Sequence, residues 1–393
     1  RQNLNSLIIS TPENRPSLCC QRATQLENVY FIDAYKDQIV KSQHLPLYVD
    51  FLRVVHQSPQ LLAQCLAVAD EMQSFSLNTT SSKSEQISQV AQVISAGIYG
   101  NSIHGRDVEM MLKLLDKLLY LKVSTTEDPR RLLRHSSSSF AKLYRKFHES
   151  SLSSKLFLTA TLHEPIMSVL IESNSMLDIE HENGINSNGS NKFSVDPEVV
   201  FALASKFIQS LCENWIIFPS TVRWLVQTMF KYLSEKGCDE KTIIEVLTDM
   251  VFVHFICPAC TDPNLYGIID APISGNARDI LIKIGQVLQK LALTRHQNFP
   301  DLDTRFDFNV ISVLMDKLLE NTYDISEMGL SHQLPTLYNI GRSSILMTHS
   351  EITLFIQFLK KTLDSDQIDE NEKKKFKSML DALPTLIDSL IRI

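Results

Sequence analysis

The sequence has 393 residues, of which 44% are hydrophobic and 21% are charged, so it can form one large domain or two to three ordinary ones and is not disordered over most of its length. A net charge of −7 argues against a broad nucleic-acid-binding surface and leaves room only for a local basic groove. Seven irregularly spaced cysteines favour a reducing compartment. We find no secretory signal and no apolar run of the ~18 residues that a membrane span needs. The first residue is Arg1, so we expect a piece of a longer chain.

Helical periodicity dominates the chain from residue 109 onward. Apolar residues recur on one helical face between residues 109 and 121. Asp196, followed by Pro197, predicts the start of another helix. The same periodicity predicts helices over residues 220–233, 241–255, 277–293, 309–319, 351–363 and 372–383, the last ending before Pro384. With eleven glycines and no regularly alternating segments, the sequence predicts an all-α fold.

Two polar segments interrupt the helical pattern. Residues 78–85 are rich in serine and threonine, and residues 179–191 are rich in asparagine, glycine and serine. Both are predicted to be surface loops. Neither is long enough to separate independent domains, and we find no internal repeat.

The segment from His254 to Cys260 contains a Cys-x-x-Cys pair that suggests redox or metal chemistry. A redox pair needs its first cysteine at a helix N-terminus, whereas Cys257 follows a helical run. A zinc site needs a fourth ligand from a second paired element, which the sequence lacks. We therefore expect these cysteines to be reduced and free of metal. Phosphate-binding glycine loops and hydrolase or metalloprotease motifs are also absent from the sequence.

A basic segment extends from Asp128 to His135 and contains three arginines within five residues, followed by four serines at 136–139. Such a hydroxyl-rich basic turn can receive a phosphate group. The alternative reading, favoured by composition alone, is a solvated loop between two helices.

Several blocks, in order and at matching spacing over residues 90–330, resemble the Ras-GAP domain family. Leu132-Leu133-Arg134-His135-Ser136-Ser137 resembles the finger loop, and the later blocks are Phe157-Leu158 with Leu162 and Pro165, Phe218-Pro219 with Arg223, Phe252–Ala259, Asp262–Ile268, and Leu288-Gln289 with Ala292. Tyr99-Gly100-Asn101-Ser102 also resembles the finger but lies too early and lacks the arginine, so we interpret it as a turn.

The resemblance implies a Ras-GAP-type helical domain over residues 76–334 and an extra helical subdomain from residues 1–75 and 335–393. It implies an activator of a partner's GTPase rather than an enzyme, with Arg134 as the arginine finger and no cofactor of its own, because GTP and Mg²⁺ belong to the partner. It places GTPase-binding or loop-supporting roles on Arg131, His135, Ser136, Ser137, Arg223, Phe252, His254, Cys257, Pro258 and Gln289. We expect Arg134 on an exposed loop, outside any internal salt bridge, with Arg131 as the rival finger.

Three positions depart from the family pattern. His254 replaces the arginine that braces the finger, Cys257 replaces an asparagine, and Gln286 replaces a lysine. A histidine is shorter and often neutral, so it braces less. Two hypotheses therefore remain: a GTPase-activating domain acting through Arg134, or a catalytically weak Ras-GAP fold that serves as a binding or scaffolding module of a Rab exchange factor.

The closer resemblance is to endocytic proteins with an N-terminal Ras-GAP domain and a C-terminal Vps-nine-type exchange domain. It rests on residues 128–134, 155–165 and 266–273. It implies a Ras- or Rab-type GTPase as partner, no nucleic acid, and a cytoplasmic protein recruited to endocytic or early endosomal membranes through other regions or partners. Which GTPase is bound stays open at this point.

Overall fold

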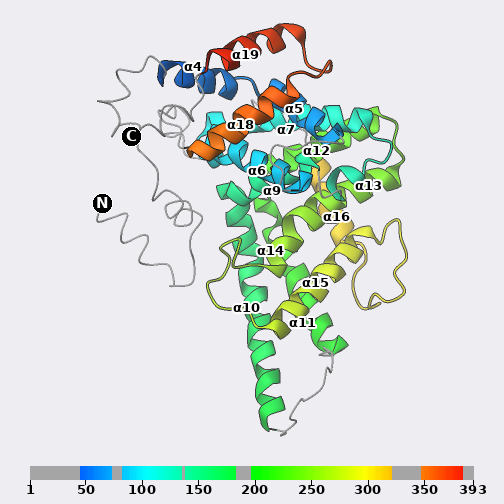
Figure 1. Ribbon diagram of the computed structural model, residues 1–393. Helices are drawn as coiled ribbons and strands as arrows, with labels where there is room; N and C mark the ends of the chain where they lie inside the picture. Colours follow the sequence, from blue (N-terminus) through cyan, green and yellow to red (C-terminus); the bar gives the residue numbers. More distant parts are fainter. Residues whose placement is uncertain (1–44, 73–81, 135–137, 183–195, 321–346, 384–393) are drawn as a thin grey trace. The chain divides into compact units, whose positions relative to one another are not determined.

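The computed structural model describes residues 45–72, 82–134, 138–182, 196–320 and 347–383, and every regular element within these ranges is a helix (Figure 1). The all-α prediction is confirmed. The chain divides into two compact units, one of residues 59–343 and one built from residues 1–58 and 344–393. The boundary differs from the expected position near residue 75, because helix α5 (Pro59–Glu71) belongs to the larger unit and packs on helix α7 (Gly105–Thr125).

The smaller unit contains helices α4 (Leu45–His56), α18 (His349–Thr362) and α19 (Glu370–Ala382), and α19 contacts both of the others. Their inward faces bury Phe51, Phe355, Phe358 and Phe376. Helix α18 begins with a capping box in which the Thr348 hydroxyl accepts from the Glu351 N–H and the Glu351 carboxylate accepts from the Thr348 N–H.

The larger unit continues after α5 with α6 (Lys83–Gln92), the π-helical turns η3 (Val93–Ile98), the short η4 (Gly100–Ser102), α7, α8 (Arg131–Arg134) and α9 (Ser139–Ser150). The predicted helix at 109–121 is confirmed as the middle of α7. The turn predicted near Tyr99 is also confirmed: Gly100, Asn101 and Ser102 have φ of 52°, 55° and 56°. This left-handed backbone ends η3 and redirects the chain into α7.

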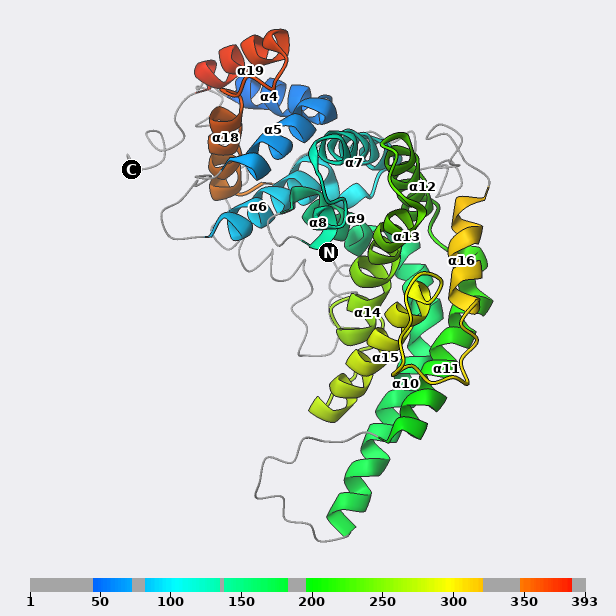
Figure 2. The same ribbon diagram turned by 90° about the vertical axis from the view of Figure 1, so that its right-hand side faces the viewer.

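The second half of the larger unit consists of α10 (Leu152–Glu182), α11 (Pro197–Asn214), η5 (Trp215–Ile217), α12 (Ser220–Glu235), α13 (Glu240–Thr248), η6 (Asp249–Ile256), α14 (Cys257–Thr261), α15 (Gly275–Leu293) and α16 (Val310–Leu319). Helices α10, α11 and α15 lie side by side in Figure 1 and Figure 2. Helix α11 begins as predicted, with the Asp196 side chain accepting from the N–H of Glu198. Helix α10 extends to Glu182, so the loop predicted from residue 179 begins too early.

Helices α13, η6 and α14 form one continuous rod from Glu240 to Thr261. By length and composition alone this rod could cross a membrane, although Glu245 and Asp249 interrupt its apolar sequence. Buried positions make up 72% of its most apolar stretch, as expected of a core helix. Its middle segment, Asp249–Ile256, winds as a π-helix, and such wide turns occur frequently at functional sites.

Candidate functional site

An aromatic cluster joins three of the sequence blocks described above. Phe157 on α10, Phe218 before α12 and Phe255 on η6 are all buried, and their ring centroids are 5.1, 5.9 and 5.8 Å apart for the pairs 157–218, 157–255 and 218–255. Trp215 packs on Phe218 and donates its indole N–H to the Leu314 carbonyl at 2.9 Å. Residues that are distant in sequence therefore form one rigid support beneath the π-helical turns.

A buried carboxylate on η6 holds two arginines. The Asp249 side chain is fully buried at the start of η6. Its Oδ2 atom accepts from Arg134 Nε at 2.7 Å and from Arg130 Nε at 2.8 Å, and its Oδ1 atom accepts from Arg134 Nη2 at 2.8 Å. The charge-assisted bonds to Asp249 are the main reason that the pKa of Arg134 is raised, so Arg134 stays charged.

The environment of Arg134 differs from the one expected. Arg134 is the last residue of the short helix α8, whose Leu132 and Leu133 side chains are buried, and its guanidinium is held in an internal ion pair. The expectation of a finger free of internal salt bridges is therefore wrong for this structure. The Arg134 side chain is nevertheless 45% exposed, so it lies at the protein surface. The Arg131 side chain is 79% exposed and lies 4.0 Å from the Asp128 carboxylate.

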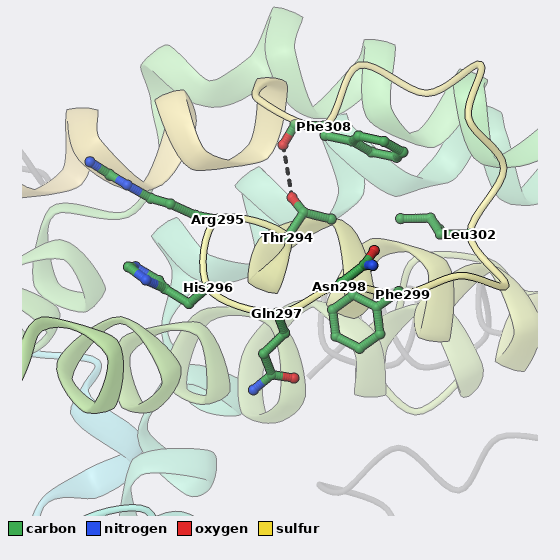
Figure 3. Close-up of a pocket in the computed structure, with 8 residues that line it drawn as sticks. All are labelled: Thr294, Arg295, His296, Gln297, Asn298, Phe299, Leu302 and Phe308. Atoms are coloured by element: carbon green, nitrogen blue, oxygen red, sulfur yellow. Dashed lines mark hydrogen bonds between the residues drawn. The ribbon is translucent and has the colours of Figure 1, made fainter.

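Arg130 has a second carboxylate partner, which connects the arginines to the segment after α15. Arg130 Nη1 donates to Glu245 Oε2 at 2.7 Å, and Gln297 donates to the other Glu245 oxygen. Figure 3 shows Gln297 among the residues around an open depression of about 340 Å³, which Thr294, Arg295, His296, Asn298, Phe299, Leu302 and Phe308 complete. Through its bond to Glu245, Gln297 joins the lining of this depression to the carboxylate that holds Arg130.

His254 lies within electrostatic reach of this cluster. Burial lowers the pKa of His254, with Asp249 opposing and the positive charges of Arg145 and Arg134 adding to the effect. Its Nε2 atom is buried and has no hydrogen-bond partner among the described residues. Because a depressed pKa keeps the imidazole neutral at pH 7, His254 does not supply the positive charge of a bracing arginine.

The segment beyond Arg134 is anchored again where α9 begins. The Asp70 carboxylate accepts the Ser139 N–H at 3.1 Å and the Ser139 hydroxyl at 2.8 Å, and it lies 3.3 Å from the Lys122 ammonium. The Ser138 hydroxyl caps α9 by accepting the Ala141 N–H. His135, Ser136 and Ser137 fall outside the described residues, so their roles stay predictions.

The other predicted positions have different environments. Phe252 is fully buried in η6, so its role is to fill the core rather than to touch a partner. Arg223 on α12, Pro258 on α14 and Gln289 on α15 are half-buried, and no hydrogen bond or ion pair among the described residues joins their side chains to Asp249. Sequence reasoning missed Arg130, Asp249 and Glu245 as members of the site. An aspartate within an otherwise apolar helical run was the available signal.

The paired cysteines lie where the helical rod continues into α14. Burial raises the pKa of the Cys257 thiol to about 12 and also raises the pKa of the Cys260 thiol, which suppresses thiolate chemistry. Cys257 Sγ contacts the Gly285 carbonyl at 3.4 Å, and both cysteines are free of disulfides. Among the residues that the structure describes, no group of three or more His, Cys, Asp or Glu is placed to hold a metal ion.

Comparisons with known proteins assign part of this chain to a protein family. The family model described as GTPase-activator protein for Ras-like GTPase matches residues 190–293. The chain is 33% identical over 98% of its length to receptor-mediated endocytosis protein 6 homolog of Drosophila pseudoobscura pseudoobscura, covering 22% of that protein. It is 31% identical over 98% of its length to GTPase-activating protein and VPS9 domain-containing protein 1 of Xenopus laevis, covering 27% of that protein. It is 32% identical over 94% of its length to the Homo sapiens protein of the same name, covering 26% of it.

The chain thus spans about a quarter of the length of the relatives it matches. The family match begins at residue 190 and ends at residue 293, so it includes the aromatic residues Phe218 and Phe255 together with Asp249 and His254. The similarity to the relatives extends across Arg134 as well, because it covers nearly the whole chain. The chain therefore contains a domain of the GTPase-activator family for Ras-like GTPases and is a homologue of these endocytic proteins.

Proposed function

We propose that this domain binds a GTP-loaded small GTPase of Ras or Rab type and accelerates hydrolysis of its GTP through Arg134. In this mechanism the arginine enters the partner's nucleotide site and stabilises the negative charge that develops on the transferring phosphoryl group. Arginine suits this task because it stays charged and offers a planar fork of donors. GTP and Mg²⁺ would belong to the partner, and the domain would need no cofactor of its own.

One observation carries the proposal. Arg134 follows two buried leucines that fix the end of α8, and its half-exposed guanidinium contacts η6 directly through Asp249. The region that the family model matches, which includes Asp249, therefore contacts the segment that resembles the finger loop. The names of the relatives include receptor-mediated endocytosis and a VPS9 domain. They support a role in endocytic membrane traffic, in a cytoplasmic protein recruited to endosomal membranes by other regions or partners.

A second candidate function is a GTPase-binding module that does not accelerate hydrolysis. Two observations favour it: Arg134 is already paired with Asp249, and burial keeps His254 neutral where the family places an arginine. Such a module would hold a GTPase near an exchange domain elsewhere in the protein.

A panel of GTP-loaded Ras- and Rab-type GTPases separates these functions. Single-turnover phosphate release would be measured with the wild-type chain, R134A and R131A, and binding would be measured with a non-hydrolysable GTP analogue. We expect R134A to lose stimulation and to retain most of the binding, because the charge that Arg134 meets is largest in the transition state. Loss only in R131A would move the finger to Arg131. Binding without stimulation by the wild type would establish the second candidate, and absence of binding across the panel would refute both.

A further inference from the structure

Two arginines from one short segment share a single buried carboxylate. Arg130 and Arg134 are one helical turn apart, and both donate Nε and Nη2 bonds to Asp249. Arg130 also pairs with Glu245, so the cluster contains two positive and two negative side chains. The two carboxylates of this cluster are neutralised by an equal number of arginines only while Arg134 is bonded to Asp249.

In this arrangement Arg134 cannot reach into another protein. The Asp249 carboxylate is fully buried, and the inner edge of the Arg134 guanidinium lies 2.7 and 2.8 Å from its two oxygens. A guanidinium so placed lies against the surface of its own domain. The long side chain must leave Asp249 before its fork can meet a phosphate inside a partner's nucleotide site.

Arg134 is also the arginine that can leave at the lower cost. Its side chain is 45% exposed and contacts one carboxylate, whereas that of Arg130 is 20% exposed and bridges two. After Arg134 departs, Arg130 remains bonded to both Asp249 and Glu245. The buried carboxylate of Asp249 would therefore not be left without a positive partner, which is the costly outcome for a buried charge.

We propose that Asp249 is a latch: it stores Arg134 on the domain in the free protein, and the terminal phosphate of GTP in a docked GTPase displaces it while Arg130 keeps the carboxylate paired. This inference rests on the proposed function of Arg134 and adds a means of regulating it. A phosphate group carries more negative charge than a single carboxylate and accepts the same fork of donors, so it competes effectively for Arg134. In the absence of a bound GTPase, the latch keeps the cationic side chain of Arg134 from binding other anions.

The latch can be tested in the free chain, independently of any GTPase. An arginine-selective dicarbonyl reagent would be applied to the native chain, and modification of each arginine would be followed by mass spectrometry. We expect D249N to speed modification of Arg134 by about 10-fold or more. Without the carboxylate, a larger fraction of the molecules has an unpaired Arg134 guanidinium that the reagent can reach. R130Q should do the opposite, since Arg134 would become the only arginine on Asp249. R130Q also keeps the test open if D249N does not fold.

Arg305 provides a control outside the cluster. Its side chain is 46% exposed and pairs with two carboxylates: Nε donates to Asp303 Oδ1 at 3.0 Å and Nη2 to Asp303 Oδ2 at 2.6 Å, and Nη1 donates to Glu198 Oε2 at 2.8 Å. D303N should leave modification of Arg134 unchanged, and D249N should leave modification of Arg305 unchanged. Equal modification of Arg134 in the wild type, D249N and R130Q would overturn the latch.

The same variants are then assayed for single-turnover GTP hydrolysis on a GTPase that the wild type binds. A rise in stimulation in D249N that disappears in D249N/R134A supports the latch. Faster modification of Arg134 together with weaker stimulation would overturn it, because Asp249 would then position the finger rather than restrain it. Faster modification with no stimulation by any variant would keep the latch and refute the proposed GTPase-activating function.

Discussion

Ser139 donates both its backbone N–H and its hydroxyl to the carboxylate of Asp70, which ties the first turn of α9 to the end of α5. The same carboxylate lies 3.3 Å from the Lys122 ammonium, and both charged side chains are about 10% exposed or less. The segment that carries Arg134 is thus anchored at both ends, by Asp249 before residue 135 and by Asp70 after residue 137.

Replacing Asp70 should destabilise the larger unit strongly. D70A leaves the buried Lys122 ammonium with the Ala67 carbonyl and a more distant carboxylate, that of Glu71 at 3.9 Å, and it removes two hydrogen bonds from Ser139. We therefore expect a loss of about 3–5 kcal/mol in the free energy of unfolding. S139A removes only the hydroxyl bond and should cost about 1 kcal/mol. Urea denaturation measures both. A cost below about 1 kcal/mol in D70A would show that the ion pair adds no net stability.

Replacing Arg134 with lysine tests the geometry of the finger. Arginine fingers contribute about 10³–10⁵ in rate, and an ammonium group cannot reproduce the fork of donors. R134K should therefore lose most of the stimulation of GTP hydrolysis and retain affinity for the GTP-bound partner. Single-turnover hydrolysis and binding by titration check this. Stimulation near that of the wild type would mean that Arg134 acts only as a positive charge.

Restoring an arginine at position 254 should strengthen the domain as an activator. His254 is neutral and lies one π-helical turn after Asp249, whose charge acts on it. An arginine there would stay charged and would compete with Arg134 for the carboxylate. We expect H254R to raise stimulation about 10-fold, which corresponds to about 1.4 kcal/mol in the barrier. H254Q, which adds no charge, should match the wild type, and H254R/R134A should be inactive.

His148 should make the stability of the larger unit dependent on pH. It is fully buried between the rings of Tyr144 and Phe255, and burial lowers its pKa to about 3. The unfolded chain binds a proton near pH 6.5 that the folded chain excludes, so this contribution is complete above pH 6.5 and is lost as pH falls toward 3. At pH 5 the loss amounts to about 2 kcal/mol.

The measurement is the free energy of unfolding between pH 7 and pH 5, in the wild type and in H148Q. The substitution should remove most of this slope, whereas H163Q, at an exposed histidine, should keep it. An unchanged slope in H148Q would show that His148 is not the group responsible.

The cysteines of the Cys-x-x-Cys pair should be unreactive in the folded chain. Cys260 is fully buried and the Cys257 thiol has a pKa of about 12, whereas Cys212 is exposed. Alkylation by iodoacetamide should modify Cys212 well before Cys257 or Cys260, and elemental analysis should find no stoichiometric zinc. Zinc that disappears in C257A/C260A would contradict the assignment.

The features predicted correctly are those that depend on residues close together in the sequence. Asp196 and Pro197 mark the start of α11 because a cap and a first-turn proline act within a few residues. The end of α10 was misjudged because residues 179–182, three of which are polar, continue a helix that the preceding turns have already nucleated. The aspartate in an apolar run marks Asp249 as unusual, but no local pattern pairs it with Arg134, because the two residues are 115 positions apart.

The neutral state of His254 was foreseen only as a general property of histidine. Its cause is tertiary: the imidazole lies in a desolvated site near two arginines from other helices, Arg134 and Arg145. Likewise, the blocks around Phe157, Phe218 and Phe255 were found as separate stretches of sequence. Their convergence into one aromatic cluster depends on packing between α10, η5 and η6.

The π-helical winding of Asp249–Ile256 gives this segment one residue more than an α-helix uses over the same rotation. The six residue steps from Asp249 to Phe255 in this wide winding turn the chain about as far as five steps of about 100° in an α-helix. Deleting Val253 should therefore let the segment close as an α-helix while Asp249 still faces the arginines and Phe255 still faces the aromatic cluster. A one-residue deletion within the α-helical turns of α13 has no such slack and would rotate the residues on its two sides against each other by about 100°.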